Sequence, residues 1–230
     1  MTDLFLSLAA FILAHTIPAV PGLRARLTGL LGERVYIAVY ALVSAGLLAW
    51  LIQAALTAPY LPLWYPAPWQ AWVPIILMPI ALWLLVAGLA SANPLSISLF
   101  GTNPDIKAGA IVTVTRHPVL CGFALWSMSH MVPNGDVAAL ILFGSMTVLA
   151  LGGIPLLDRK ARQRLGSRWA DLARPTSVLP FAAILDGRGR LRADRPLAIG
   201  GLVAAVLSAW LLLGGHVALF GVDPLALALG

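Results

Sequence analysis

Four side chains of an otherwise strongly apolar chain have the chemistry to hold a metal ion or a cofactor. They are His15, Arg116, His117 and His130. His15 lies in the first apolar run. The other three lie within residues 115–136, where Arg116 and His117 stand at the start of a second run that contains His130. Because ionisable groups at membrane depth are costly, they mark functional sites by default. These four residues are therefore the candidate site.

The pair His15 and His130 is suited to haem. Two neutral imidazoles that face each other across a helix bundle can hold a haem iron from both axial sides. The alternative is that each histidine hydrogen-bonds a neighbouring helix and binds nothing. At about 1.5 Å per residue, His15 lies roughly 10 Å before the cytoplasmic end of its run and His130 roughly 18 Å beyond Pro118. The pairing therefore requires helix tilt to absorb the difference.

Arg116 and His117 directly precede Pro118, and proline is readily tolerated in the first turn of a helix. At that place the two side chains can present a cationic edge to an anion or a cofactor. The alternative is that Arg116 snorkels to lipid phosphates. Two other candidates have simpler explanations: His216 is typical of a satisfied interfacial residue, and Cys121 of an inert buried thiol.

Composition requires lipid as the solvent for most of the chain. Of the 230 residues, 60% are hydrophobic and 10% charged. Apolar runs of about 20 residues are long enough to cross a bilayer as helices. We expect an all-α polytopic membrane protein, a single integral membrane domain over residues 1–230, with about six transmembrane helices. The predicted spans are residues 4–22, 35–57, 72–91, 110–132, 137–157 and 197–220.

The net charge of +6 comes from cations confined to loops on one side of the membrane. All fifteen Lys and Arg residues fall within residues 24–34, 107–116 and 159–195. The partner of these loops is therefore the lipid bilayer, with no nucleic acid, and the positive-inside rule puts both termini on the periplasmic side. The segment 158–195 is predicted to begin as a basic helix at the membrane surface and to become extended over residues 174–181.

With these residues in place, the chain resembles the NnrU family of bacterial membrane proteins. Three ordered blocks carry the resemblance: His15-Thr16-Ile17-Pro18, Thr115-Arg116-His117-Pro118 through His130, and Thr176-Ser177-Val178-Leu179-Pro180-Phe181. The resemblance implies a multi-pass protein of the bacterial inner membrane. It also implies an association with nitrite and nitric oxide reduction in denitrifying bacteria, without a settled reaction.

The NnrU family is related to plant 15-cis-zeta-carotene isomerase, a membrane enzyme in which two histidines hold haem b. That relation implies His15 and His130 as the haem ligands here, and a hydrophobic small molecule as substrate. In the isomerase, a cysteine three residues before the second histidine serves as an alternative ligand. This chain has Ser127 at that place, which departs from the redox switch of the isomerase.

A more distant similarity links the chain to isoprenylcysteine carboxyl methyltransferases. Arg116-His117-Pro118 resembles the region of those enzymes that binds S-adenosylmethionine. The chain departs from their pattern at Leu120, where they have tyrosine, and at Asp158-Arg159, where they have two glutamates. Three functions therefore stay open: a haem-dependent isomerase or redox protein, a methyltransferase, and a non-enzymatic accessory protein of denitrification.

Overall fold

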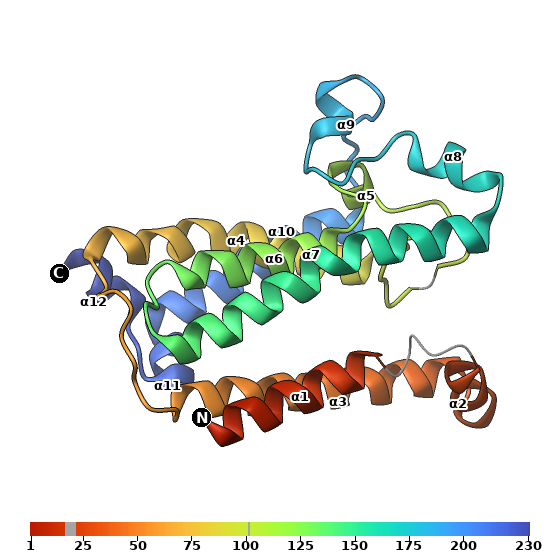
Figure 1. Cartoon of the computed structure of the whole chain (residues 1–230). Helices are drawn as coiled ribbons and strands as arrows, with labels where there is room; N and C mark the ends of the chain where they lie inside the picture. Colours follow the sequence, from red (N-terminus) through yellow and green to blue (C-terminus); the bar gives the residue numbers. More distant parts are fainter. Residues whose placement is uncertain (17–21, 101) are drawn as a thin grey trace. The chain divides into compact units, whose positions relative to one another are not determined.

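The computed structural model of the chain is all-helical in the parts that it describes, which are residues 1–16, 22–100 and 102–230 (Figure 1). Four of its helices are long and apolar enough to cross a membrane, and the first helix is shorter but also apolar. The chain is therefore a polytopic membrane protein. The helices are α1 (Thr2–Thr16), α2 (Leu23–Leu31), α3 (Glu33–Leu56), α4 (Pro68–Ala90), α5 (Ile111–Val114), α6 (Pro118–Met131), α7 (Val137–Leu165), α8 (Arg168–Ala173), α9 (Ala182–Leu185), α10 (Arg195–Trp210), the π-helical turn η2 (Leu211–Gly215), α11 (His216–Phe220) and α12 (Pro224–Leu229).

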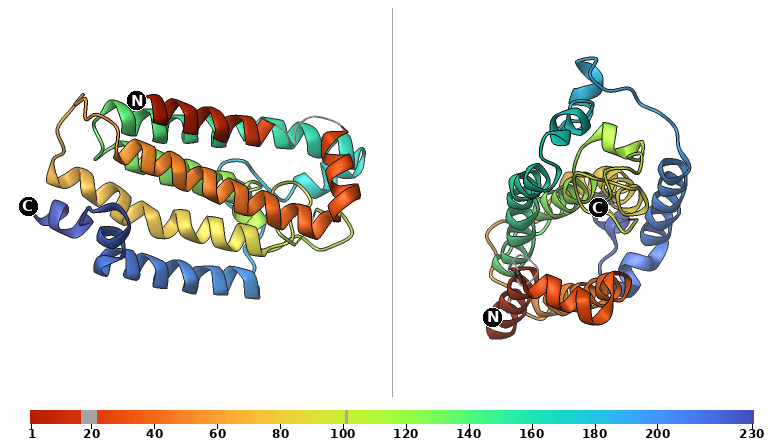
Figure 2. Two further views of the ribbon diagram at one scale, coloured as in Figure 1. Left: turned by 90° about the horizontal axis from the view of Figure 1, so that it is seen from below. Right: turned by 90° about the vertical axis from the view of Figure 1, so that its right-hand side faces the viewer.

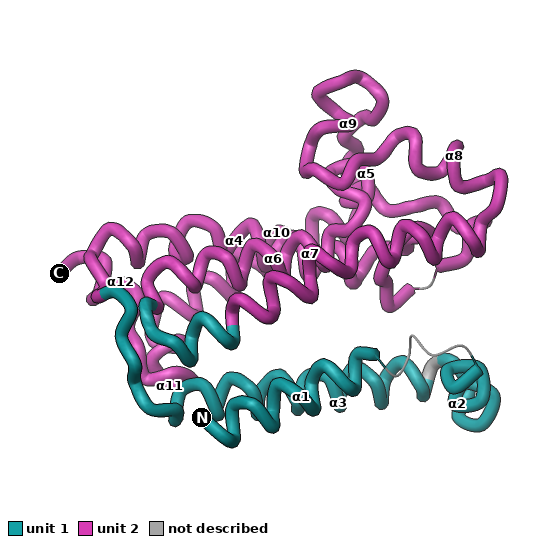
Figure 3. Tube along the Cα trace, viewed as in Figure 1, with its two compact units in different colours: residues 1–64, 135–142 teal, residues 65–134, 143–230 magenta. Residues whose placement is uncertain are grey.

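The chain forms two compact units (Figure 3). Unit 1 consists of residues 1–64 and 135–142, and unit 2 of residues 65–134 and 143–230. In unit 1, α1 packs along α3, and the Trp50 indole donates a hydrogen bond to the Asp3 carboxylate over 3.2 Å. Backbone hydrogen bonds from Leu63 to Gly135 and from Val137 to Leu61 join its two stretches of sequence.

Unit 2 is built around α4, against which both α6 and α10 pack (Figures 1 and 2). Small residues allow this close approach. A Cβ at Gly122 of α6 would lie 2.8 Å from the Ala81 carbonyl oxygen of α4, which is closer than real Cβ atoms come. On α10, Gly200, Ala204 and Ser208 form the buried stripe. Small residues are the usual contact surface of membrane helices because van der Waals packing replaces the hydrophobic effect there.

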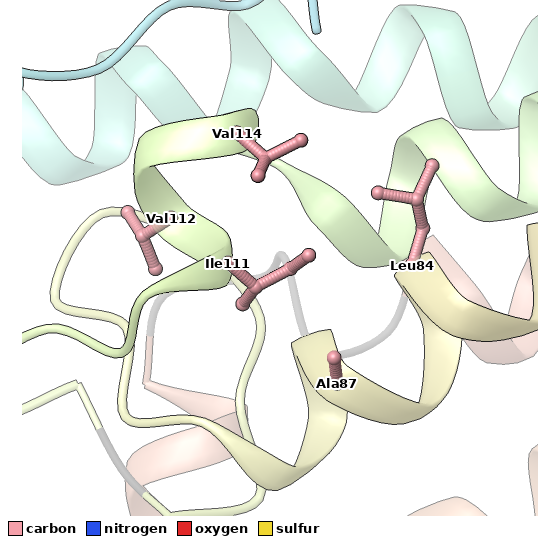
Figure 4. Close-up of a cluster of buried hydrophobic side chains, with 5 residues drawn as sticks. All are labelled: Leu84, Ala87, Ile111, Val112 and Val114. Carbon is pink, nitrogen blue, oxygen red and sulfur yellow. The ribbon is translucent and has the colours of Figure 1, made fainter. Parts of the chain in front are cut away.

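The C-terminal end of α4 packs against α5. Figure 4 shows the buried cluster that results, in which Leu84 and Ala87 of α4 face Ile111 and Val114 of α5. This cluster fixes the start of the connection that leads from α5 to Arg116. The apolar contact thus positions the charged residues that follow.

Replacing Gly200 with alanine should destabilise the α4–α10 contact by about 1–3 kcal/mol, the usual result of overpacking. A Cβ at Gly200 would lie 2.8 Å from the Ala87 Cβ and 2.9 Å from the Ala87 nitrogen, which the α4 backbone holds in place. The matched control is Gly201→Ala, whose added Cβ would be 3.7 Å from Trp83, an ordinary contact. Unfolding in mixed detergent micelles should separate the two variants, and equal midpoints would contradict the packing argument.

The predicted span 110–132 is wrong as a single helix. The chain forms α5, leaves the helix at Thr115, and re-enters at Pro118 as α6, which has 14 residues. Thr115 is extended, and the Arg116 N–H donates to the Ser177 carbonyl over 2.7 Å instead of to a helical neighbour. Hydropathy could not reveal this break because the residues on both sides of it are mainly apolar, and residues 114–120 are all buried.

Other predicted boundaries shift. The basic helix expected after residue 157 forms, but as a direct continuation of α7, which ends at Leu165. The third span begins at Pro68 instead of residue 72, because proline suits the first helical position. The last described residue of α1 is Thr16, so residues 17–21 of the first predicted span lie outside the described residues.

Candidate functional site

His15 and His130 have the same local geometry. Each imidazole Nδ1 lies 2.8 Å from the carbonyl oxygen of the residue four positions earlier, Phe11 for His15 and Trp126 for His130. A carbonyl oxygen only accepts, so Nδ1 is the protonated nitrogen in both rings. A neutral imidazole has only one N–H, so with the proton on Nδ1 the Nε2 atom is unprotonated and has a lone pair available. Metal-ligating histidines are held in this tautomer by the same kind of bond.

Aromatic rings fix the orientation of both imidazoles. Phe11 stacks on His15 with a centroid distance of 4.1 Å, and Phe143 of α7 lies 5.2 Å from His130. In the described part of the chain, neither Nε2 has a hydrogen-bond partner. His15 belongs to unit 1 and His130 to unit 2. Each unit therefore presents one oriented imidazole with an available nitrogen.

Arg116 and His117 converge on one carboxylate, that of Asp158 on α7. The Arg116 Nη1 donates to Asp158 Oδ2 over 2.7 Å, and His117 Nε2 to Asp158 Oδ1 over 3.1 Å. The other imidazole nitrogen, Nδ1, lies 2.8 Å from the Ser96 hydroxyl. The carboxylate accepts from Nε2–H, so Ser96 donates to Nδ1 when His117 is neutral. These bonds attach the segment just before α6 to helix α7.

Further contacts hold Arg116 in this place. Its Nε donates to the Thr176 hydroxyl over 2.8 Å, and its guanidinium lies 5.4 Å from the centre of the Trp169 ring. The Asn93 side chain donates to the Arg116 carbonyl over 3.0 Å. Residues far apart in the sequence therefore meet at Arg116, which has 8% of its surface exposed.

The opposite charges of Arg116 and Asp158 neutralise each other within the site. His117 precedes the first residue of α6 and is fully buried. Burial lowers its pKa below the ordinary value, and the charge and hydrogen bond of Asp158 offset this only in part. With His117 neutral, the Arg116 cation and the Asp158 anion balance one another. An external anion at Arg116 would have to compete with a carboxylate already bound.

A family model described as NnrU protein matches residues 3–224. The chain belongs to the NnrU family.

Two curated relatives extend this assignment. The NnrU chain is 36% identical over 84 residues to the chloroplastic 15-cis-zeta-carotene isomerase of Zea mays and 33% identical over 84 residues to that of Arabidopsis thaliana. Each match covers 36% of this chain and 23% of the isomerase, so the chain spans about a quarter of the length of these relatives. No solved structure matches the chain.

The remaining polar candidates of this NnrU chain form hydrogen bonds with neighbouring protein groups. Ser127 donates to the Phe123 carbonyl and contacts the Thr147 hydroxyl at 2.7 Å. Cys121 lies 3.4 Å from the Thr115 hydroxyl. The His216 Nδ1 bonds the Val222 carbonyl over 2.8 Å. Among the described residues, no group of three or more His, Cys, Asp or Glu side chains could hold a metal ion.

Two features of the site were not identified from the sequence. One is the aromatic residue four positions before each candidate histidine, a spacing that is visible in Phe11–His15 and Trp126–His130. The other is Asp158 as the partner of Arg116 and His117. The sequence does signal it weakly, because Asp158 is the first charged residue after a long apolar run. Its partners lie more than 40 residues away and leave no local pattern.

Proposed function

We propose that this NnrU-family protein binds haem b and that His130 and His15 would hold it through their imidazole nitrogens. The observation that carries the proposal is the shared orientation of the two imidazoles, in which a bond from Nδ1–H to the i−4 carbonyl leaves Nε2 available. The donor set fits the cofactor, because neutral imidazole nitrogens are common axial ligands of haem iron. Apolar helices around His130 would also suit a porphyrin.

Bound haem supplies an iron centre that can polarise a double bond or exchange one electron. The chain's own contribution is orientation and exclusion of water. Phe11 and Trp126 fix the tautomer of the two imidazoles through their carbonyls, and Phe143 limits rotation of the His130 ring. The Arg116–Asp158 pair has a positioning role in this proposal, since it ties the start of α6 to α7.

The substrate class that follows is a hydrophobic small molecule that enters from the bilayer. The curated relatives are named for 15-cis-zeta-carotene, a conjugated hydrocarbon, which favours isomerase-like chemistry on a double bond. A redox-linked reaction associated with nitrite and nitric oxide reduction would use the same two histidines. Ser127 already binds Phe123 and Thr147, so no side chain at that position replaces the alternative cysteine ligand.

The membrane topology that belongs to this proposal has six crossings. They comprise the four long apolar helices together with α1 and α6. In a bacterial inner membrane, the positive-inside rule orients the basic segment after α7 toward the cytoplasm and both termini toward the periplasm. In this topology, His130 would lie in the periplasmic half of α6, 12 residues beyond Pro118.

The direct test is the absorption spectrum of the detergent-purified protein, oxidised and reduced, after expression with ample haem. A Soret band with sharp reduced α and β bands, at about one haem per chain, supports the proposal. A colourless protein would overturn it. S-adenosylmethionine binding lost in Arg116→Ala and His117→Ala would then favour the methyltransferase alternative. A growth defect on nitrite without catalytic turnover would favour an accessory role in denitrification.

A further inference from the structure

The segment between α8 and α10 exposes apolar side chains that no other part of unit 2 covers. We name residues 177–192 the α9 loop. Leu179 is 72% exposed, Phe181 42% and Leu185 85%. Exposed apolar side chains that gather on a surface mark a place that meets another apolar phase or a partner. The three residues fall within seven positions of one another, so we define them together as the apolar patch of the α9 loop.

One backbone hydrogen bond and one side-chain hydrogen bond hold the α9 loop on the connection between α5 and α6. The Phe181 N–H donates to the Val114 carbonyl over 2.7 Å, and the Thr115 hydroxyl donates to the Val178 carbonyl over 2.8 Å. The Phe181 N–H and the Val178 carbonyl therefore have their hydrogen-bond partners on the side of the loop that faces the protein. The apolar side chains of Leu179 and Leu185 are left on the outside.

Phe181 also adopts an uncommon backbone conformation. Its φ is 64°, in the left-handed region, and it is the one described residue other than glycine with a positive φ. Bulky residues avoid that region, so the surrounding bonds must hold Phe181 there. Such strain is a recurrent feature of functional surfaces. Here it starts α9 directly after Pro180 and keeps a large aromatic ring at the surface.

Two exposed cations follow the apolar residues in the same loop. Arg190 and Arg192 are exposed on either side of Leu191, which is itself 55% exposed. Within the described residues, no carboxylate pairs with either arginine. Nearby Arg188 is different, because it forms an ion pair with Asp186 at 2.7 Å. The surface of the α9 loop is therefore apolar with uncompensated positive charge at its edge.

The position of the α9 loop fits the level of the lipid head groups. It lies in the stretch that joins two membrane-spanning helices, after the end of α7 and before the start of α10. Figures 1 and 2 show α9 projecting sideways from the bundle of unit 2 at that end. A sideways projection at the end of a transmembrane bundle extends over the surrounding leaflet.

We propose that the α9 loop is an interfacial anchor that binds anionic phospholipids of the membrane in which the protein resides. Leu179, Phe181 and Leu185 insert among the upper acyl chains, while Arg190 and Arg192 bind phosphate groups. Charge complementarity selects this occupant, because apolar residues beside basic ones are typical of segments that lie in a membrane interface. The anchor holds α5 and Arg116 against α7 from the membrane side. This inference stands independently of haem.

The test uses the full chain reconstituted into liposomes of phosphatidylcholine with or without phosphatidylglycerol. In a Cys121→Ser background, an environment-sensitive fluorophore is attached at Leu185→Cys. The matched control carries it at Ala170→Cys, an exposed site on α8. Quenching by lipids with a spin label near the head group reports immersion. Circular dichroism and gel filtration verify that each variant is folded.

We expect strong quenching at position 185 and little at position 170, with quenching at 185 greater in the anionic liposomes. Arg190→Glu with Arg192→Glu should lower the equilibrium constant for immersion about 30-fold or more, from roughly 1 kcal/mol per cation at an anionic surface. Equal quenching at the two positions would overturn the proposal. Quenching at position 185 that changes neither with lipid charge nor with the Arg190→Glu and Arg192→Glu substitutions would also overturn it. Protection of position 185 in detergent that disappears on dilution would show that a second copy of the chain covers the patch.

Discussion

His130→Ala should be purified with almost no haem, and its affinity for added haem should fall at least about 100-fold. Loss of an outer partner of a metal-ligating histidine alone costs about 10–100-fold, so loss of the ligand costs at least as much. His15→Ala should have a similar effect on the spectrum. The measurement is haem titration of the purified variants, followed at the Soret band and normalised to folded protein.

The control variant is His216→Ala. His216 is also a histidine of unit 2 whose Nδ1 bonds a backbone carbonyl, that of Val222 at 2.8 Å, but it is assigned no ligand role. It should retain haem. Imidazole added to His130→Ala should restore the Soret band, because the small ligand can occupy the space left by the side chain. An unchanged spectrum in His130→Ala, or haem loss in His216→Ala alone, would contradict the assignment.

The sequence predicts the helices well because apolar runs and prolines determine them locally. Pro118 begins α6 at its first position, as expected. The interruption before it was not predictable from hydropathy, since residues 110–132 form a mainly apolar run that is long enough for one transmembrane helix. Partners about 60 residues away produce the break, through bonds from Thr115 and Arg116 to the start of the α9 loop.

The four candidate residues can be picked out from the sequence because polar side chains are conspicuous in an apolar chain, and their role in binding a cofactor stays a prediction. The acid that Arg116 and His117 share cannot be picked out in the same way, because Asp158 belongs to a basic stretch where an ion pair with any neighbour is equally plausible. Only the tertiary fold of unit 2 brings α7 to the start of α6. Buried ion pairs depend on such long-range packing and leave no periodic signal.

Asp158→Ala should destabilise unit 2 by about 3–5 kcal/mol, because it leaves the buried Arg116 cation without a counter-charge. The two side chains are only 10% and 15% exposed, so solvent cannot replace the lost partner. Unfolding in mixed micelles, followed by circular dichroism and by the fluorescence of Trp169 beside Arg116, would measure the loss. Asp105→Ala is the control. Its ion pair with Arg168 has the same kind of contact at 2.9 Å but is exposed, so the midpoint should hardly move.

The double variant Arg116→Ala with Asp158→Ala distinguishes a structural pair from a cofactor site. Once one partner is absent, removing the other also removes an unpaired buried charge, so the double variant should lose much less than the sum of the single variants. Haem per folded chain should stay close to that of the wild type in all three. If Arg116→Ala instead lost haem while its unfolding midpoint stayed unchanged, Arg116 would act on the cofactor. Arg116 would then be a cofactor-binding residue, as predicted from the sequence, and its ion pair with Asp158 would be of less importance for its role.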